Sequence, residues 1–191
     1  MMMTIPGLKI VLPSNPYDAK GLLKTAIRDD NPVIFFEHKR LMWGGPTSQV
    51  PEEEYLIPFG KAEVKREGTD VTVLTTAYMV IRALNAAETL QKEKGISLEI
   101  IDPRTIVPFD KEAVLKSVAK TGRLVCFTEE CESGSFASYV AGVVADEGFD
   151  YLDAPIKRVN APNTPVPYGI LLEDYWMPKE EQLIKAVEEI I

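Results

Sequence analysis

The sequence predicts an α/β protein with three layers and a mostly parallel sheet. Segments with the composition of strands alternate with segments whose apolar residues recur every three to four positions, as in helices that pack on a sheet. Glycines stand where two of these helices should end. The strand expected at residues 33–36 is wholly apolar, which is typical of a parallel sheet covered on both faces. Alternation over this many units favours the three-layer arrangement.

Length and composition are those of an ordinary soluble globular protein. The 191 residues are 46% hydrophobic and 26% charged, enough for one full domain with an attached segment or for two small domains. No apolar run approaches the roughly 18 to 20 residues that span a bilayer, and the first residues lack the pattern of a signal peptide. The two cysteines, Cys126 and Cys131, are too few for a disulfide framework. We therefore expect a reducing, cytoplasmic location and no membrane partner.

The formal charge of −8 is unevenly distributed. Residues 1–43 carry six Lys and Arg against four Asp and Glu, a balance of +2, whereas residues 44–191 carry fifteen against twenty-five, a balance of −10. An acidic domain repels nucleic acid and anionic lipid and favours a basic protein partner. The charge therefore argues against nucleic-acid binding.

The first expected unit lies between residues 8 and 36. Residues 8–12 have the composition of a strand, and Asn15 followed by Pro16 marks a helix start, because asparagine caps the first turn and proline suits the first helical position. The helix should end by about Asp30, two residues before a proline. Residues 33–36 follow as a second strand. This makes one βαβ unit, which cannot cover its own apolar surface.

A second series of elements begins near residue 58. It follows residues 44–58, which are rich in glycine, proline and glutamate and are interpreted as a linker or extended loop. Gly95 and Gly122 stand where the first two helices of this series should stop. The expected strands are residues 61–65 at an edge, 70–76 at the centre, 96–101, 124–128 and 156–159, and the expected helices are residues 78–94, 110–120, 136–147 and 178–191.

Eight separated segments carry a resemblance to a known family. They are residues 6–11 (PGLKIV), 16–23 (PYDAKGLL), 26–34 (AIRDDNPVI), 37–39 (EHK), 65–72 (KREGTDVT), 101–105 (IDPRT), 149–156 (FDYLDAPI) and 163–168 (NTPVPY). In this order they resemble the β subunits (E1β) of the thiamine-diphosphate-dependent pyruvate, acetoin and branched-chain 2-oxo acid dehydrogenases. The resemblance covers essentially the whole chain.

The resemblance implies a division into three parts. Residues 1–44 would be the C-terminal remnant of a transketolase-like pyrimidine-binding domain, a βαβ remnant that precedes the three-layer domain. Residues 45–57 would be a linker, and residues 58–191 a transketolase C-terminal-like domain. The intact enzyme would decarboxylate a 2-oxo acid and pass the acyl unit to lipoyl-E2.

The resemblance also implies that no catalytic or cofactor-binding residue lies in this chain. In the family, the glutamate that engages the cofactor's aminopyrimidine ring and an active-site histidine precede the first matching segment, and the α subunit holds the diphosphate and its magnesium. His38, the only histidine, is not at the family's catalytic position. We therefore expect an inactive fragment that serves subunit assembly and E2 docking. The alternatives are part of another transketolase-superfamily enzyme, such as a deoxyxylulose-phosphate synthase, and a stand-alone non-catalytic binding module.

A structural potassium site is implied at the end of the first helix. Unpaired carbonyl groups at a helix C-terminus carry the negative end of the dipole, and oxygen ligands suit a hard cation. Residue by residue, Ala26 and Ile27 match the family's carbonyl ligands, and Asp29 and Asn31 match its other ligands. Without the resemblance, a plain helix end with polar turn residues is the simpler interpretation.

Three protein partners are implied: a second β chain in a β–β dimer, the E1α subunit, and the peripheral subunit-binding domain of E2. Glu188 and Glu189 lie near the end of the closing helix, and the carboxylate of Ile191 adds a third negative charge. Acids are unfavourable at a helix C-terminus, so we expect these charges to cost local stability and to serve a basic partner. The simpler interpretation is solvation.

Two other features are expected to be structural. Cys126 and Cys131 have the wrong spacing for a zinc ribbon or a redox pair. The loop at residues 129–135 joins a strand to a helix, as phosphate-binding loops do, but its three glutamates would repel phosphate. We expect this loop to shape a subunit contact.

Overall fold

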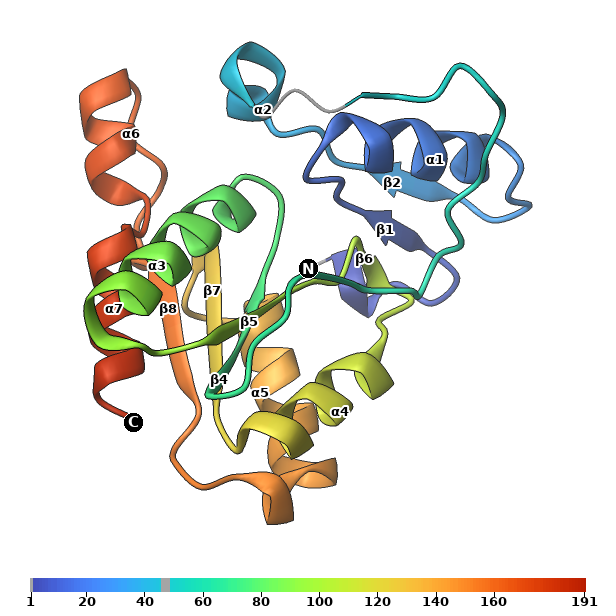
Figure 1. Cartoon of the computed structure of the whole chain (residues 1–191). Helices are drawn as coiled ribbons and strands as arrows, with labels where there is room; N and C mark the ends of the chain where they lie inside the picture. The colour runs from blue at the N-terminus through green and yellow to red at the C-terminus, as the bar shows by residue number, and fades with distance from the viewer. Residues whose placement is uncertain (1, 46–48) are drawn as a thin grey trace.

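A computed structural model describes residues 2–45 and 49–191, which form two sheets (Figure 1). The smaller sheet has the strand order β2-β1-β6, with β1 Lys9–Val11, β2 Val33–Phe35 and β6 Thr105–Val107. The larger sheet has the order β3-β5-β4-β7-β8, with β3 Glu63–Arg66, β4 Val71–Thr75, β5 Leu98–Asp102, β7 Leu124–Cys131 and β8 Lys157–Ala161. The helices are α1 Pro16–Ile27, α2 Lys39–Gly44, α3 Met79–Lys94, α4 Lys111–Thr121, α5 Phe136–Glu147, α6 Ile170–Trp176 and α7 Glu180–Glu188, with single 3₁₀ turns at Met2–Thr4 and Phe149–Tyr151.

The larger sheet confirms the predicted three-layer, mostly parallel architecture. Strands β5, β4, β7 and β8 are parallel, and β3 joins the edge antiparallel to β5. Helices α3 and α7 pack on one face, where Val73 of β4 and Phe127 of β7 are fully buried. Helices α4 and α5 pack on the other, against Leu74 and Cys126 (Figure 1). Neighbouring residues of one strand thus face opposite layers, which explains why every residue of β4 is buried.

The local signals for helix ends are confirmed. The Asn15 side chain accepts a hydrogen bond of 2.9 Å from the backbone N–H of Asp18 and so caps α1. Gly95 and Gly122 end α3 and α4 in the left-handed conformation, with φ of 71° at each. Helix α1 then packs closely on the returning chain, because a side chain at Gly21 would lie 2.6 Å from Ile57.

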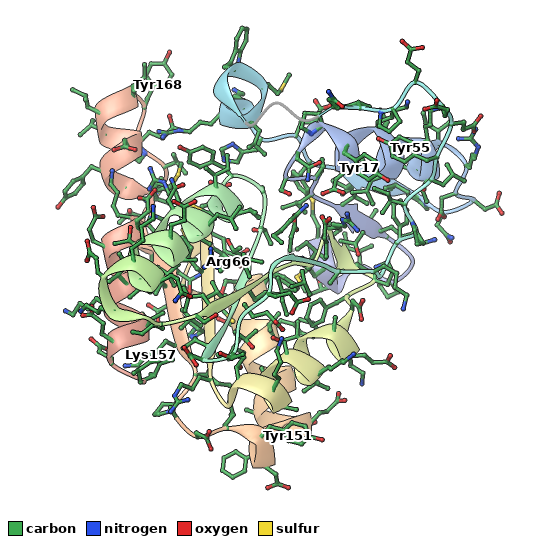
Figure 2. The ribbon with its side chains drawn as sticks, in the orientation of Figure 1. Tyr17, Tyr55, Arg66, Tyr151, Lys157 and Tyr168 are labelled. Atoms are coloured by element: carbon green, nitrogen blue, oxygen red, sulfur yellow. The ribbon has the colours of Figure 1, made fainter. Side chains whose placement is uncertain are left out.

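The βαβ unit forms as predicted, but its second strand is less covered than its sequence indicates. Strands β1 and β2 pair in parallel, and each residue of β2 is only half-buried because β2 is the edge of the smaller sheet. The part of the expected linker that follows residue 48 runs back along α1. There Tyr55 stacks on Tyr17, with 4.5 Å between ring centroids, and donates a hydrogen bond to its carbonyl (Figure 2). Residues 46–48 of the expected linker lie outside the described residues.

Four features depart from the sequence expectations. Helices α2 and α6 and strand β6 form where no element was expected, and β7 runs to Cys131 instead of Thr128. Strand β6 pairs antiparallel with β1, so it leaves the region of the larger sheet and extends the smaller one.

Among the described residues, no helix has both the length and the apolar character needed to cross a bilayer.

Candidate functional site

A cavity of about 620 Å³ lies where β4 and β7 end, beside the chain that follows β2. Carboxyl ends of parallel strands are a common place for binding sites in α/β proteins. Its polar groups include His38 after β2, Thr76 after β4, Thr128 to Glu130 in the last part of β7, and Glu173 of α6. Apolar side chains, including Leu12, Phe36 and Met177, supply the rest of the wall.

His38 is held by contacts on both of its ring nitrogens. Its Nδ1 accepts a hydrogen bond of 3.2 Å from the backbone N–H of Arg40, which makes His38 the N-cap of α2. Nε2 therefore carries the proton in the neutral ring and donates it to Glu129, 2.8 Å away. The ring also stacks on Tyr78, with 5.4 Å between centroids. Because Nδ1 is already occupied, these contacts orient the histidine but leave it no free lone pair for a substrate.

Tyr78 is the centre of a cluster that joins α2, α3 and α6. The guanidinium groups of Arg40 and Arg82 lie 5.7 and 5.5 Å from the centre of its ring. Both arginines also reach Asp174 of α6, at 3.3 Å and 2.9 Å. Hydrogen bonds from Lys179 above all, and from the two arginines, hold the pKa of Asp174 at about 2. These charges fix α6 on the domain although its outer face is exposed.

The loop at residues 129–135 is occupied by its own side chains. The carboxylate of Glu130 accepts a hydrogen bond of 3.0 Å from the N–H of Ala137, and Ser135 accepts one from the N–H of Ser138 at the same distance. Burial raises the pKa of Glu130, against the lowering effect of the hydrogen bonds that its carboxylate accepts, the strongest of them from Ala137. Because the first N–H groups of α5 are taken, the loop does not offer them to a phosphate.

Neither cysteine has the surroundings of a metal ligand or a reactive thiol. Cys126 is buried in β7, and burial raises the pKa of its thiol to about 12. Cys131 is half-buried at the end of the same strand, with its sulfur 3.7 Å from the carbonyl of Thr164. Within residues 2–45 and 49–191, no group of three or more His, Cys, Asp and Glu side chains is placed to hold a metal ion.

The four residues matched to a cation site lie at the C-terminal end of α1 and in the turn that follows it. The backbone N–H of Asp29 donates to the carbonyl of Ala26 at 3.3 Å, and Ile27 is exposed. The carboxylate of Asp29 accepts hydrogen bonds from the backbone and the side chain of Asn31, at 2.9 and 3.0 Å. The same carboxylate forms an ion pair with Lys9, so a cation at this turn would have to share it.

The two acids near the end of α7 are paired within the chain. Glu188 forms an ion pair with Lys94, at the end of α3, and Glu189 forms one of 2.6 Å with Lys157 of β8. The hydrogen bond from Lys157 lowers the pKa of Glu189. Lysines of neighbouring elements thus offset the unfavourable position of these acids at the negative end of the helix dipole, and so reduce the expected cost in local stability. Ile191 is exposed beyond them.

Sequence reasoning considered His38 but missed its partner. Glu129 lies 91 positions further along the chain, and Tyr78 lies on a third segment. No spacing rule joins such residues. The sequence carried no signal for this pair, because β2 and β7 belong to different sheets, and only the packing of the two sheets brings His38 to Glu129.

Comparison with known proteins extends the resemblance to nearly the whole chain. Residues 60–183 match the transketolase C-terminal domain family, and residues 1–43 match the transketolase pyrimidine-binding domain family. The β subunit of the acetoin:2,6-dichlorophenolindophenol oxidoreductase of Bacillus subtilis is 48% identical over 98% of this chain and 54% of its own length. From the same organism, the 2-oxoisovalerate dehydrogenase β subunit is 48% identical and the pyruvate dehydrogenase E1 β subunit 43% identical, each over 97% of this chain and 56% of the relative.

A solved structure shows the same fold. It is described as a split-gene transketolase in an inactive β4 tetramer, and it superposes with a TM-score of 0.81 over 99% of this chain and 59% of that one, at 24% identity. The chain thus spans a little over half the length of the curated relatives it matches. These findings confirm the resemblance drawn from the eight segments: the chain belongs to the transketolase C-terminal domain family, and its relatives include β subunits of 2-oxo acid dehydrogenases.

Proposed function

We propose that this chain is the C-terminal part of the β subunit of a thiamine-diphosphate-dependent 2-oxo acid dehydrogenase, E1. The observation that carries the proposal is the identity of 43–48% to such β subunits over nearly every residue of the chain. In this proposal, residues 1–44 end the pyrimidine-binding domain, residues 45–57 link it to the next domain, and residues 58–191 form the C-terminal domain.

The chain would serve assembly, whereas the chemistry would need groups supplied by other parts of the enzyme. Thiamine diphosphate, when bound, supplies the carbanion-stabilising chemistry of 2-oxo acid decarboxylation. Two features of this chain favour a role in assembly over a role in the chemistry. His38 is committed to Arg40 and Glu129, and the N–H groups at the start of α5 are committed to Glu130 and Ser135.

The proposed partners are a second copy of the β subunit, the E1α subunit and the peripheral subunit-binding domain of E2. The relatives are named as subunits, and the solved structure of the same fold is described as a tetramer, which supports a multi-subunit assembly. We also propose that the turn formed by Ala26, Ile27, Asp29 and Asn31 binds potassium in the assembled enzyme. Three of the four are joined by the hydrogen bonds of this turn, which supports the proposal.

Reconstitution tests the proposal. The chain would be mixed with the N-terminal portion of the Bacillus subtilis pyruvate dehydrogenase β subunit that it does not match, together with the α subunit of that enzyme. We expect a complex that contains all three polypeptides and, when thiamine diphosphate and magnesium are added, either decarboxylates pyruvate or a branched-chain 2-oxo acid or cleaves the carbon–carbon bond between the two oxygen-bearing carbons of acetoin. Failure of the chain to enter any complex with these subunits would overturn the proposal. Condensation of pyruvate with glyceraldehyde 3-phosphate would instead support a deoxyxylulose-phosphate synthase.

A further inference from the structure

One of the crossings of the chain between its two sheets is a tight connection. Strand β5 of the larger sheet ends at Asp102, and β6 of the smaller sheet begins at Thr105. Between them Arg104 adopts the left-handed conformation, with φ of 58°. Its backbone N–H donates to the carboxylate of Asp102 at 2.9 Å, and its carbonyl accepts from the N–H of Leu12, next to β1, at 2.9 Å. This connection therefore hydrogen-bonds to both sheets.

Five charged side chains surround this connection. They come from α1, β3, the end of β5 and the connection itself, and they are Asp18, Glu63, Lys65, Asp102 and Arg104. The Lys65 ammonium lies 2.8 Å from Asp18, and the Arg104 guanidinium lies 2.6 Å from Asp18 and 2.7 Å from Glu63. The side chains of Asp18 and Asp102 are fully buried. Three carboxylates thus share two cations, so the cluster holds one negative charge in excess when every group is ionised.

Asp102 is the carboxylate without a cation of its own. Lys65, which contacts Asp18 and Glu63, remains 3.9 Å from Asp102, and the Arg104 guanidinium is engaged by Asp18 and Glu63. One oxygen of Asp102, Oδ1, accepts a hydrogen bond from the Arg104 N–H, whereas the other, Oδ2, is buried and has no hydrogen-bond partner among the described residues. A buried carboxylate in this position is stabilised by taking up a proton.

The direction in which the pKa of Asp102 is shifted agrees with the burial of its carboxyl group and the incomplete pairing of that group. Burial raises the pKa of Asp102 from 3.8 to about 6, and the charge of Asp18 adds to the rise. The charge of Lys65 and the hydrogen bonds from Ser14 and Arg104 act in the opposite direction but do not overcome burial. A carboxyl whose pKa is higher in the closed junction than in an opened, solvated one binds its proton more tightly when closed. The closed junction therefore gains stability as the pH falls.

We propose that this cluster is a proton-responsive latch between the two sheets, in which protonation of Asp102 tightens the junction and ionisation loosens it. The proposal concerns the junction and does not depend on the function proposed above. The loosening occurs as the pH rises from about 4 to about 6, because the group changes charge only between its open and closed pKa values. From well below pH 4 to well above pH 6, the opening constant of the junction should rise by about 100-fold, since each unit of pKa difference is a factor of ten.

Hydrogen exchange of the whole chain tests the latch. Protection factors, corrected for the intrinsic pH dependence of exchange, would be measured between pH 4.5 and 7.5. They would be compared for the Leu12 amide at the junction and for the Thr72 amide, which donates to Arg123 within the larger sheet. In the native chain we expect the opening constant at Leu12 to rise by about ten- to thirtyfold over this interval, while that at Thr72 changes much less. Equal changes at the two amides would overturn the proposal.

Two variants isolate the role of Asp102. Asp102→Asn keeps the size of the side chain and removes its titration, so the pH dependence at Leu12 should disappear. Glu93→Gln removes one negative charge from the exposed surface of α3, outside the cluster, and leaves all five charged groups of the cluster in place, so the pH dependence should remain. If Asp102→Asn does not fold, carbon NMR of the native chain replaces it. An Asp102 carboxyl that titrates near pH 6 together with the Leu12 amide supports the latch, and a midpoint near pH 4 overturns it.

Discussion

Lys9 of β1 forms an ion pair with Asp29, which follows α1, so the protein's own ammonium group lies at the turn proposed to bind potassium. The contact with Lys9 and the hydrogen bonds from Asn31 lower the pKa of Asp29 to about 2. Because this pKa is lower in the folded chain, the interaction stabilises the fold above about pH 4, and its contribution is lost as the pH falls towards 2. Lys9 and a bound cation therefore compete for one carboxylate.

Replacing Lys9 with methionine should strengthen potassium binding at this turn. In the native chain, we expect potassium chloride to raise the melting temperature more than an equal concentration of sodium chloride, by ligand linkage. The difference between the two salts should grow in Lys9→Met, because Asp29 is then free to bind the ion. Lys116→Met, which removes an exposed lysine from α4, is the control and should leave the difference unchanged. Identical melting in both salts, for both the native chain and Lys9→Met, would exclude the site.

The isolated chain should not decarboxylate 2-oxo acids, with or without thiamine diphosphate and magnesium. The described residues offer no metal-ion cluster, and they commit the donors at the start of α5 to Glu130 and Ser135. Catalysis depends on groups placed at hydrogen-bonding distance from the reacting atoms. The measurement is a turnover assay with pyruvate and branched-chain 2-oxo acids. Steady product formation above a blank that contains only the cofactor would contradict the prediction.

The sequence predicted those parts of the fold that local interactions decide. Asn15 caps α1 through a contact three residues away, and Gly95 and Gly122 end their helices by their own backbone conformation. Strand β6, in contrast, has three residues and exists because it pairs with β1, almost 100 positions earlier. The last residues of β7 were missed because Cys131 pairs with Ala161 in a shifted register. Long-range pairing of this kind leaves no periodic signal in a short segment.

The candidate sites were predictable only in part, for the same reason. The residues of the turn after α1 are adjacent in sequence, so the resemblance located them together. The lysines that pair with the acids of these two sites are distant in the sequence. Lys9 of β1 pairs with Asp29, Lys94 of α3 pairs with Glu188, and Lys157 of β8 pairs with Glu189. The helix dipole alone predicts that acids are unfavourable at the end of α7, because it takes no account of the lysines that pair with them.

The chain should self-associate through the exposed apolar face of α6. Leu171 and Tyr175 are 86% and 87% exposed, and Tyr168 before the helix extends fully into solvent (Figure 2). Trp43 of α2, whose neighbour Arg40 contacts α6, is 87% exposed. An apolar surface of this kind is unusual on a monomer and favours association. Light scattering at high micromolar concentration should therefore give the mass of a dimer or a larger oligomer.

Leu171→Asp tests whether α6 is the surface in question. A charge at a central apolar contact should weaken association by about tenfold or more. The control is Phe149→Asp, because Phe149 is also exposed but lies in the turn after α5, at the opposite end of the domain (Figure 1). Equal weakening by the two substitutions would exclude a specific role for α6, and a monomer mass for the native chain at every concentration would contradict self-association itself.

The acidic C-terminal region should bind the basic peripheral subunit-binding domain of a cognate E2. Residues 44–191 carry an excess of ten negative charges, which steers a basic partner towards them. Binding should weaken strongly with salt, because such steering is screened within about 8 Å at physiological ionic strength. Calorimetry at low and high salt measures this directly, and the absence of heat at low salt would contradict docking.

The roles of Glu188, Glu189 and Ile191 in this docking need a variant that respects their ion pairs. Reversing the charges to lysine would place each new ammonium against Lys94 or Lys157 and disturb the fold, whereas Glu188→Gln with Glu189→Gln removes the charges without repulsion. If the two acids leave their lysines to bind the partner, the glutamine pair should weaken docking by about tenfold and reduce its dependence on salt. Glu52→Gln with Glu53→Gln changes the net charge equally on an exposed loop and should have a much smaller effect. Equal effects of the two pairs would show that overall charge, and not the end of α7, attracts the partner.

Removal of Ile191, which is 54% exposed, moves the terminal carboxylate and should weaken docking further if that charge takes part.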